Sequence, residues 1–344
     1  MQIVHLSFRW TIFFYKDIVK WMQMVVHYNP LRGRMKHRIA FLLTGLILVS
    51  CIPSPEVTAD TPEDKLAEIQ ARGTLVIATD ADYMPQSKLL QDVPPARGTK
   101  CEPLQYTANQ LTGFDVAVAV EIARRLQVEP CFVTPPWSQL IAGNWGDNWD
   151  IHVGSVGITE ERLEHLYFSQ PYYATPVVIL LHEKNSTFQS AADISGKRIG
   201  VCAGCTFEAY LQGTLELPGE ELLFQIQSAR IVAYQNEDPA IDDLALGDGL
   251  KLDAVITVLP KAHAAIQGGK PVKLLDGGIL LEYASITMDR LSNRDPARLL
   301  DQISSLIQEM HRTGKLRDLS FYYQGLDLTQ EAARFDLASL DPAP

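Results

Sequence analysis

The sequence lacks the residue patterns on which many metalloenzymes and serine hydrolases depend. Its eight histidines show no metal-binding spacing such as His-Glu-x-x-His, and no Ser-His-Asp grouping stands out. There is no kinase or cyclase region, no internal repeat and no low-complexity tract. We therefore expect no metal site and no cofactor, and we expect a protein that is not an enzyme.

Basic side chains are scarce beyond residue 50. The first 50 residues hold seven of the 30 Lys and Arg residues but one of the 41 Asp and Glu residues. The rest of the chain therefore carries 23 basic and 40 acidic side chains. Its net negative charge repels the phosphates of nucleic acids. We expect no nucleic-acid partner. The composition, 47% hydrophobic and 21% charged over 344 residues, is typical of one or two globular lobes.

The N-terminal part of the chain predicts an export signal. A short basic stretch from Met35 precedes the uncharged, largely apolar residues 39–50, and Cys51 follows. That order is typical of a secretory signal, and the apolar run is too short for a membrane-spanning helix of about 20 residues. Leu48-Val49-Ser50-Cys51 resembles the bacterial lipobox, whose cysteine is lipidated. A plain secretory signal with an unmodified cysteine is the alternative.

The segments on either side of this signal bear on where the protein is located. We interpret residues 1–34 as an extension that results from a misassigned start, with translation beginning at Met35; a genuine amphipathic extension is the alternative. Residues 51–64, rich in Pro, Thr and acidic residues, predict a flexible tether. The protein is then expected outside the cytoplasm, in the periplasm or at the cell surface, anchored through a lipid on Cys51.

Four cysteines remain beyond Cys51. An even number in an exported protein indicates disulfides, and four cysteines allow three pairings. We favour Cys101–Cys131 and Cys202–Cys205, because only two residues separate the second pair. The second pair is also a C-x-x-C motif that opens an expected helix, where the pKa of a thiol is lowered. A redox motif and a four-cysteine zinc site are therefore the alternatives to structural disulfides.

Strands and helices alternate along the body of the chain. Strands are expected over residues 74–79, 131–134, 150–155, 176–182, 197–201, 230–234 and 252–257, and helices over 115–126, 137–144, 206–212, 239–246, 260–267 and 296–312. The alternation predicts an α/β architecture with mostly parallel pairing, and its two successive runs predict two lobes. Residues 85–111 are expected to form a long loop held by a disulfide.

Five segments of the body occur together in the order and spacing of one known group of proteins. They are 113–116 (GFDV), 137–155, the pair 158–162 (ITEER) and 168–173 (FSQPYY), 193–201 (DISGKRIGV) and 252–255 (LDAV). Together they resemble the bacterial extracellular solute-binding proteins of family 3, the polar amino-acid-binding group. The resemblance covers nearly the whole body, from about Leu75 to Tyr323.

The resemblance implies a periplasmic-binding-protein type II fold of two lobes that close over a ligand. Lobe 1 would comprise residues 65–174 and 287–330, lobe 2 would comprise 176–283, and 331–344 would form a C-terminal tail. Two hinge crossings are expected near residues 174–175 and 284–285. The implied function is the substrate-binding component of an ABC importer, a monomer that binds an amino acid or related small carboxylate and is read by a membrane permease.

The resemblance also assigns the ligand-binding residues. Arg162 matches the arginine whose guanidinium forks two hydrogen bonds onto the ligand carboxylate, a geometry that suits that pair of groups. Cys205 and Thr206 match the turn that donates backbone N–H groups to the same carboxylate. The remaining matches are two aromatic walls and three positions for polar contacts, with glycine replacing a common threonine at the last of them: Tyr83, Trp137, Asp80, Ser155 and Gly157.

One position departs from the family pattern. Val258 stands where the family usually has an aspartate that pairs with the ligand's α-ammonium group. Either another carboxylate such as Asp80 takes that role, or the register is shifted by one or two residues, or the ligand is not an α-amino acid.

Two other functions remain as alternatives to a carrier. One is a cyclohexadienyl dehydratase-like enzyme on the same scaffold, with Glu161 or Asp80 as the general acid–base group. The other is a ligand-sensing module for a membrane partner. We expect Asp150 and Asp253 to be structural, and the aromatic loop 144–149 to serve packing.

Overall fold

The computed structural model describes residues 64–340, all of which belong to one compact unit of the chain, Thr61–Pro344. The expectations for the extension, the signal, Cys51 and residues 52–63 of the tether lie outside the described residues, as do those for 341–344. Within the described part, none of the helices combines the length and the apolar character needed to cross a membrane.

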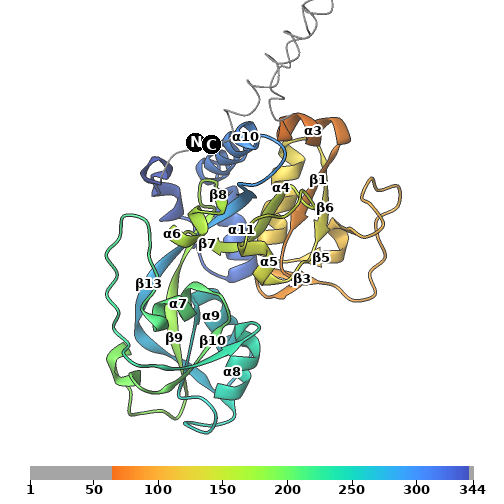
Figure 1. Ribbon diagram of the computed structural model, residues 1–344. Helices are drawn as coiled ribbons and strands as arrows, with labels where there is room; N and C mark the ends of the chain where they lie inside the picture. The colour runs from red at the N-terminus through yellow and green to blue at the C-terminus, as the bar shows by residue number, and fades with distance from the viewer. Residues whose placement is uncertain (1–63, 341–344) are drawn as a thin grey trace, which may run out of the picture. The chain divides into compact units, whose positions relative to one another are not determined.

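One mixed sheet of ten strands runs through the described part of the chain (Figure 1). Its order is β11-β10-β12-β9-β13-β7-β1-β6-β4, and β8 pairs with β13 beside this path. The strands are β1 (Thr74–Ala78), β4 (Tyr106–Thr107), β6 (Glu129–Val133), β7 (Ile151–Gly157), β8 (Leu166–Phe168), β9 (Tyr173–His182), β10 (Arg198–Cys202), β11 (Arg230–Tyr234), β12 (Ala254–Val258) and β13 (Val272–Asp289).

Lobe 1 is built on the parallel strands β6, β1 and β7. Its helices are α3 (Lys65–Arg72), α4 (Phe114–Arg125), α5 (Trp137–Ile141), α6 (Glu160–Leu163), α10 (Ala297–Arg312) and α11 (Lys315–Gln324), and a small sheet comprises β2 (Asp82–Tyr83), β3 (Ser87–Leu89) and β5 (Leu111–Thr112). The long helix α10 is amphipathic. Its buried residues include Leu299, Ile303 and Ile307 at helical spacing, and they pack in the same core as Ile77 and Phe132 of the sheet.

Lobe 2 is built on the parallel strands β11, β10 and β12, with the helices α7 (Thr206–Gln212), α8 (Glu237–Ala245) and α9 (Leu259–Gln267). The apolar run in β9 has a physical reason. Val177, Ile179 and Leu181 belong to one core of this lobe, whereas Val178 and Leu180 belong to another. Because both faces of the strand are buried, its sequence is continuously apolar rather than alternating.

Two long antiparallel strands, β9 and β13, connect the lobes (Figure 1). They pair from Val272 opposite His182 to Ala284 opposite Tyr173, and β13 then continues along β7 and β8 in lobe 1. Residues 174–175 and 284–285, the expected hinge crossings, therefore lie inside this paired ribbon. The expected parallel pairing holds for the central strands of each lobe, while the two connecting strands make the whole sheet mixed.

The expected long loop 85–111 contains β3, β4 and a short 3₁₀ helix, Ala108–Gln110. A disulfide between Cys101 and Cys131, with Cα atoms 5.4 Å apart, attaches it to β6. The second disulfide joins Cys202 and Cys205 across 5.6 Å at the start of α7. Both bridges follow the pairing favoured from the sequence.

Gly113 provides a test of the packing in lobe 1. It caps α4 with φ +128°, and a Cβ there would lie 2.2 Å from the Gln86 carbonyl oxygen. Gly213 also has a positive φ, +74°, but a Cβ added there would have no atom within 4 Å. We expect Gly213→Ala to cost about 1 kcal/mol for the left-handed backbone. Gly113→Ala should cost an additional ~1–3 kcal/mol for overpacking, measured by urea unfolding. Equal losses would contradict this account.

Candidate functional site

The predicted site residues follow the carboxyl ends of strands in both lobes. Asp80 comes after β1 and Ser155 and Gly157 end β7, while Thr206 begins the helix after β10. In open α/β sheets, ligands bind in the crevice beyond these strand ends. A cavity of about 50 Å³ lies at this place, and seven of the eight predicted residues line it: Asp80, Tyr83, Trp137, Ser155, Arg162, Cys205 and Thr206.

The Arg162 side chain is buried where the two lobes meet, with 7% of the residue exposed. Thr159 caps the short helix α6 by accepting the backbone N–H of Arg162, which fixes the start of the side chain. The guanidinium donates from Nη1 to the Gly157 carbonyl at 2.9 Å and from Nη2 to the Gly204 carbonyl at 3.3 Å. Burial lowers the pKa of Arg162, and the carboxylates of Glu282 and Glu161 oppose that shift. One buried cation thus contacts both lobes.

Further contacts join the lobes around the cavity. Trp137 donates its indole N–H to the same Gly204 carbonyl at 3.3 Å, and its ring lies 5.5 Å from the guanidinium carbon of Arg162. The Tyr83 hydroxyl donates to Glu237 of α8 at 3.3 Å. Lys261 of α9 lies 4.4 Å from the centre of the Tyr83 ring. These contacts define a closed arrangement of the two lobes.

Glu282, a residue that sequence reasoning missed, also lines the cavity. It lies on β13, and its Oε1 accepts the Thr206 hydroxyl at 2.8 Å. A Cβ added at Gly157 would stand 2.1 Å from the same oxygen, so the glycine leaves room for this side chain. Burial raises the pKa of Glu282, while Arg162 and the Thr206 hydroxyl act to lower it. In the sequence, the glycine at 157 in place of the family's threonine indicated a change in the cleft. It did not identify Glu282 as the side chain that fills the space.

Glu237, the first residue of α8, is a second cavity residue that sequence reasoning missed. It is 1% exposed, and its Oε2 has no hydrogen-bond partner among the described residues. Burial raises its pKa, and the charge of Lys261 opposes that shift. The sequence placed the helix start two residues later, at Pro239, so Glu237 was left in a connection. Its position at the end of β11 could have marked it.

Ser155 is held in its place by a buried carboxylate. Its φ is +56°, an uncommon conformation for a residue with a side chain. Its N–H donates to the Tyr172 hydroxyl at 3.0 Å, its own hydroxyl donates to Asp115 at 2.7 Å, and Tyr172 donates to the other oxygen of Asp115 at 2.8 Å. Burial raises the pKa of Asp115 to about 7, even though both hydroxyl groups favour its charged form.

His152, on the same strand as Ser155, does not line the cavity. It is fully buried between the rings of Trp137 and Trp145, and a Cβ at Gly154 would lie 2.3 Å from its Nε2. Burial, with a smaller effect from Arg162, lowers the pKa of His152 to about 3. The ring is therefore neutral, and its place beside a buried guanidinium adds no second positive charge.

The other residues singled out from the sequence have structural positions. Val258 is 3% exposed in a core of lobe 2 and does not line the cavity. Asp80 accepts the Asp82 N–H in a turn, and Asp253 pairs with Arg198 at 3.0 Å. Glu161 is exposed and lies outside the cavity lining. Of the two acids considered for catalysis, only Asp80 lines the cavity.

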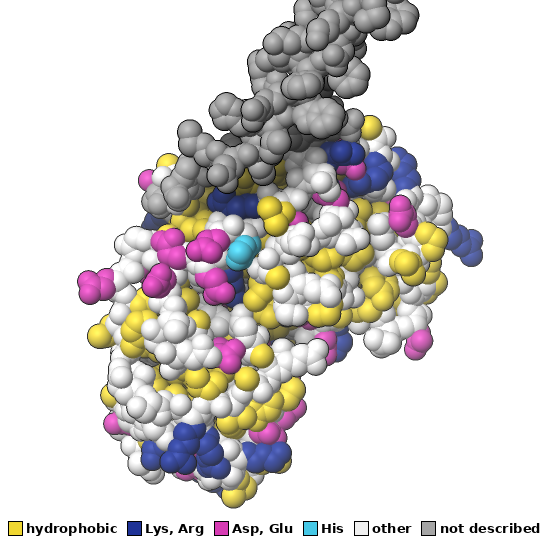
Figure 2. Space-filling view, viewed as in Figure 1, with side chains coloured by type: hydrophobic (Ala, Val, Ile, Leu, Met, Phe, Trp, Pro, Cys, Tyr) yellow, Lys and Arg dark blue, Asp and Glu magenta, His cyan; other side chains and the backbone are white. Residues whose placement is uncertain are grey.

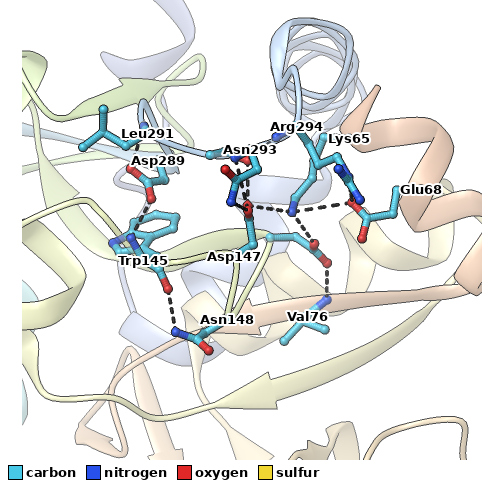
Figure 3. Close-up of polar contacts among 12 residues, drawn as sticks. Lys65, Glu68, Val76, Trp145, Asp147, Asn148, Asp289, Leu291, Asn293 and Arg294 are labelled. Carbon is cyan, nitrogen blue, oxygen red and sulfur yellow. Dashed lines mark hydrogen bonds and ion pairs between the residues drawn. The ribbon is translucent and has the colours of Figure 1, made fainter. Parts of the chain in front are cut away.

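The aromatic loop 144–149 is packed into lobe 1 (Figure 3). Asp289 accepts the backbone N–H groups of Asn144 and Trp145, and Asp147 accepts Asn293 and pairs with Lys65 at 3.3 Å. Asp150 belongs to the same cluster, because it accepts the Val76 N–H and pairs with Lys65. These carboxylates tie the loop to β1, α3 and the chain after β13, in agreement with the structural role expected of Asp150.

The comparisons with known proteins agree with this geometry. The sequence profile of the bacterial extracellular solute-binding proteins, family 3, matches residues 97–325. The L-cystine-binding protein TcyJ of Escherichia coli is 25% identical over 289 residues, covering 84% of this chain and 96% of that protein. The L-arginine-binding protein of Pseudomonas aeruginosa is 27% identical over 214 residues, 62% of this chain and 67% of that protein.

Two solved structures show the same fold. The ancestral amino acid-binding protein AncCDT-1, a precursor of cyclohexadienyl dehydratase, has a TM-score of 0.60 at 25% identity and covers 76% of this chain and all of its own. The holo form of ArgBP from T. maritima has a TM-score of 0.56 at 25% identity, covering 71% of this chain and 93% of its own.

The fold and the cleft define a two-lobed type II periplasmic binding protein. The chain belongs to the bacterial extracellular solute-binding proteins, family 3. Members of this family are extracytoplasmic and bind amino acids for ABC transporters. The role of this chain is accordingly that of a substrate-binding component.

The pKa of Asp115 predicts a pH dependence of stability. Because the folded pKa of about 7 lies above the ordinary 3.8, the folded state holds this proton more tightly than the unfolded chain. The resulting stability is complete below pH 3.8 and is lost as the pH rises through 7. Between these two pH values, the free energy of unfolding of the wild type should fall by up to about 1.4 kcal/mol per pH unit relative to that of Asp115→Asn. Urea unfolding at each pH measures this difference.

Asp82→Asn, at an exposed position on β2, is the control for this measurement. Its unfolding free energy should follow that of the wild type across the same range. If Asp115→Asn also follows the wild type at every pH, the carboxyl is not the titrating group and this account fails.

Proposed function

We propose that this cleft binds an amino acid or a related small metabolite and delivers it to an ABC permease. The buried guanidinium of Arg162 is the observation that carries the proposal, because it lies at the junction of the lobes beside Thr206. Its two carbonyl partners leave other N–H donors of the guanidinium, which has five. Closure of two lobes over a ligand creates a surface that a membrane partner can recognise.

The proposal includes the finer points that the family leaves open. The protein would act as a monomer and as a carrier rather than an enzyme, and it would be held at the membrane by lipid on Cys51. The lobe boundaries would be those of the resemblance, 65–174 with 287–330 and 176–283. Asp80, the acid–base candidate from the sequence that lines the cavity, already accepts the Asp82 N–H in a turn. Turnover of prephenate or arogenate would overturn that point.

Arg162 gives the direct test of the function. A thermal-shift screen of amino acids, their derivatives and plain carboxylates should first identify a ligand, since a compound at about 100 times its Kd adds roughly 2.7 kcal/mol of stability. Arg162→Ala should then weaken binding of that ligand at least about tenfold in calorimetry, because a charge-assisted hydrogen bond contributes roughly 1.5–3 kcal/mol.

Arg317→Ala is the matched control for Arg162. This exposed arginine pairs with its neighbour Asp318 at 3.1 Å on α11 and should leave the affinity unchanged. If Arg162→Ala folds normally and binds as tightly as the wild type, the cleft is not the binding site.

The disulfide Cys202–Cys205 should assist binding by holding the turn that carries Gly204. That turn presents the carbonyl contacted by both Arg162 and Trp137, and its N–H donates to Glu208 at 2.7 Å. Replacing both cysteines by serine should weaken ligand binding about two- to tenfold, the cost of ordering one more flexible group. The double replacement of Cys101 and Cys131, outside the cavity lining, should leave affinity within error. Equal effects of the two double variants would contradict a role for the turn.

A further inference from the structure

The anion-binding half of the cleft contains a carboxylate of the protein itself. The resemblance places the backbone N–H groups of Cys205 and Thr206 beside a ligand carboxylate, and in the structure the Thr206 hydroxyl donates to Glu282 at 2.8 Å. The nearby guanidinium of Arg162 is already bonded to the carbonyls of Gly157 and Gly204. The chain therefore supplies its own acceptors at the place where the ligand carboxylate was expected.

The absence of a side chain at residue 157 is what admits this carboxylate. A Cβ on Gly157 would approach Oε1 of Glu282 to 2.1 Å, and its Cγ and Cδ atoms to 2.7 Å. Contacts that short are essentially never made by real Cβ atoms, so a side chain at 157 would force the Glu282 side chain to shift from its present place. Gly157 and Glu282 are thus a matched pair from two different strands, β7 and β13.

The cavity has an excess of acidic groups. Three carboxylates line it, those of Asp80, Glu237 and Glu282, against the one guanidinium of Arg162. Lys261 lies outside the lining, pairs with Asp238 at 3.0 Å and acts on Glu237 through its charge, so it offsets part of this excess. The cavity lining therefore has a net negative formal charge, which favours a ligand with a positively charged group.

The unpaired oxygen of Glu237 points to the same kind of ligand. Glu237 lines the cavity while 1% exposed, and its Oε2 has no partner among the described residues. A buried carboxylate oxygen without a donor is unfavourable, and an incoming ammonium or guanidinium group would supply donors. A neutral donor could make the hydrogen bond without balancing the charge, and an anionic ligand would be repelled.

Acidic side chains also surround the mouth of the cleft. A groove of about 750 Å³ beside Arg162 is lined by residues of both lobes, among them Glu160, Glu161, Glu164, Glu208 and Glu216. Figure 2 shows acidic side chains gathered on the face in view, near one histidine. A rim of one sign concentrates ligands of the opposite charge and speeds their entry.

We propose that Glu282 is a specificity-determining residue that makes this cleft select small ligands of net positive charge, whose ammonium or guanidinium group is not balanced by a carboxylate of their own. The inference rests on the proposed function, since it assigns a class of ligand to the same cleft. Two sources share this chemistry. One is an amino acid with a cationic side chain, and the other is a small amine or guanidine without a carboxylate.

Matched pairs of ligands test the selection. Lysine with norleucine and arginine with citrulline differ in the side-chain charge, while agmatine carries the guanidinium of arginine without its carboxylate. In calorimetry, the wild type should bind the cationic member of at least one pair ten times or more tightly than the neutral member. Agmatine binding as tightly as arginine would identify the amine source, and a preference for arginine would identify the amino-acid source.

The Glu282→Gln variant tests the residue itself. It keeps the shape and the hydrogen bond from Thr206 but removes the charge, so the preference for the cationic member should fall about tenfold. Glu183→Gln, an exposed position that lines neither the cavity nor the groove, makes the same change of charge and should retain the wild-type preference. If Glu282→Gln does not fold, Glu237→Gln, at the other buried carboxylate of the cavity lining, should show the same loss of preference.

The outcomes separate this inference from the proposed function. Tighter binding of a neutral or anionic member, or an unchanged preference in Glu282→Gln, would overturn the role of Glu282 while leaving the binding function intact. If Glu282 only neutralises Arg162 structurally, its replacement would lower the melting temperature without changing the ratio within a pair. Failure of the wild type to bind any compound of the wider screen would overturn the proposed function, and this inference with it.

Discussion

The structure depends on the burial of one guanidinium between two lobes. Removing such a charge from water is costly unless hydrogen bonds and opposite charge compensate. Arg162 obtains its compensation from the Gly157 carbonyl in lobe 1, the Gly204 carbonyl in lobe 2 and the carboxylate of Glu282 on the connecting strand β13. Because these partners come from three parts of the fold, the environment of the charge is complete only when the lobes are closed. The electrostatics of one side chain are thereby coupled to the position of whole lobes.

Much of the fold could be predicted because the spacing of apolar residues in the sequence matches the faces of the strands and helices that are buried. The β9 segment, apolar at every position, and α10, apolar at helical spacing, are specified by their own residues. The first half of β13 could not be predicted, since Asp276-Gly277-Gly278 has the composition of a turn. It is extended because β9 pairs along it, with register shifts near Gly278. Helix α3 was missed because its eight residues show only the two buried apolar positions Leu66 and Ile69. Its buried Lys65 is stabilised by the distant Asp147 and Asp150, which the local sequence does not reveal.

The site divides in the same way. Trp137, Ser155 and Arg162 belong to segments with a recognisable order along the chain, so a resemblance could locate them. Glu237 and Glu282 belong to no such motif, and their place in the cavity follows from the ends of β11 and the course of β13. The space that Glu282 fills is created by a glycine 125 positions earlier, a relation that neither residue reveals alone. Local sequence therefore predicts the walls of the cleft better than the charges within it.

The resident carboxylate alters the energetics of closure. Where a ligand alone supplies acceptors to a buried arginine, the closed form without ligand leaves a charge uncompensated and is disfavoured. In this protein Arg162 has acceptors already, and the indole of Trp137 reaches the same carbonyl of Gly204. A ligand can favour closure only through interactions that it makes in the closed form and not in the open form, in addition to these contacts. Among the cavity residues, the buried Oε2 of Glu237 and the remaining N–H donors of Arg162 are groups whose pairing can still be gained. On the proposal made above, a ligand whose cationic group reaches that oxygen gains the first of these pairings as the lobes close.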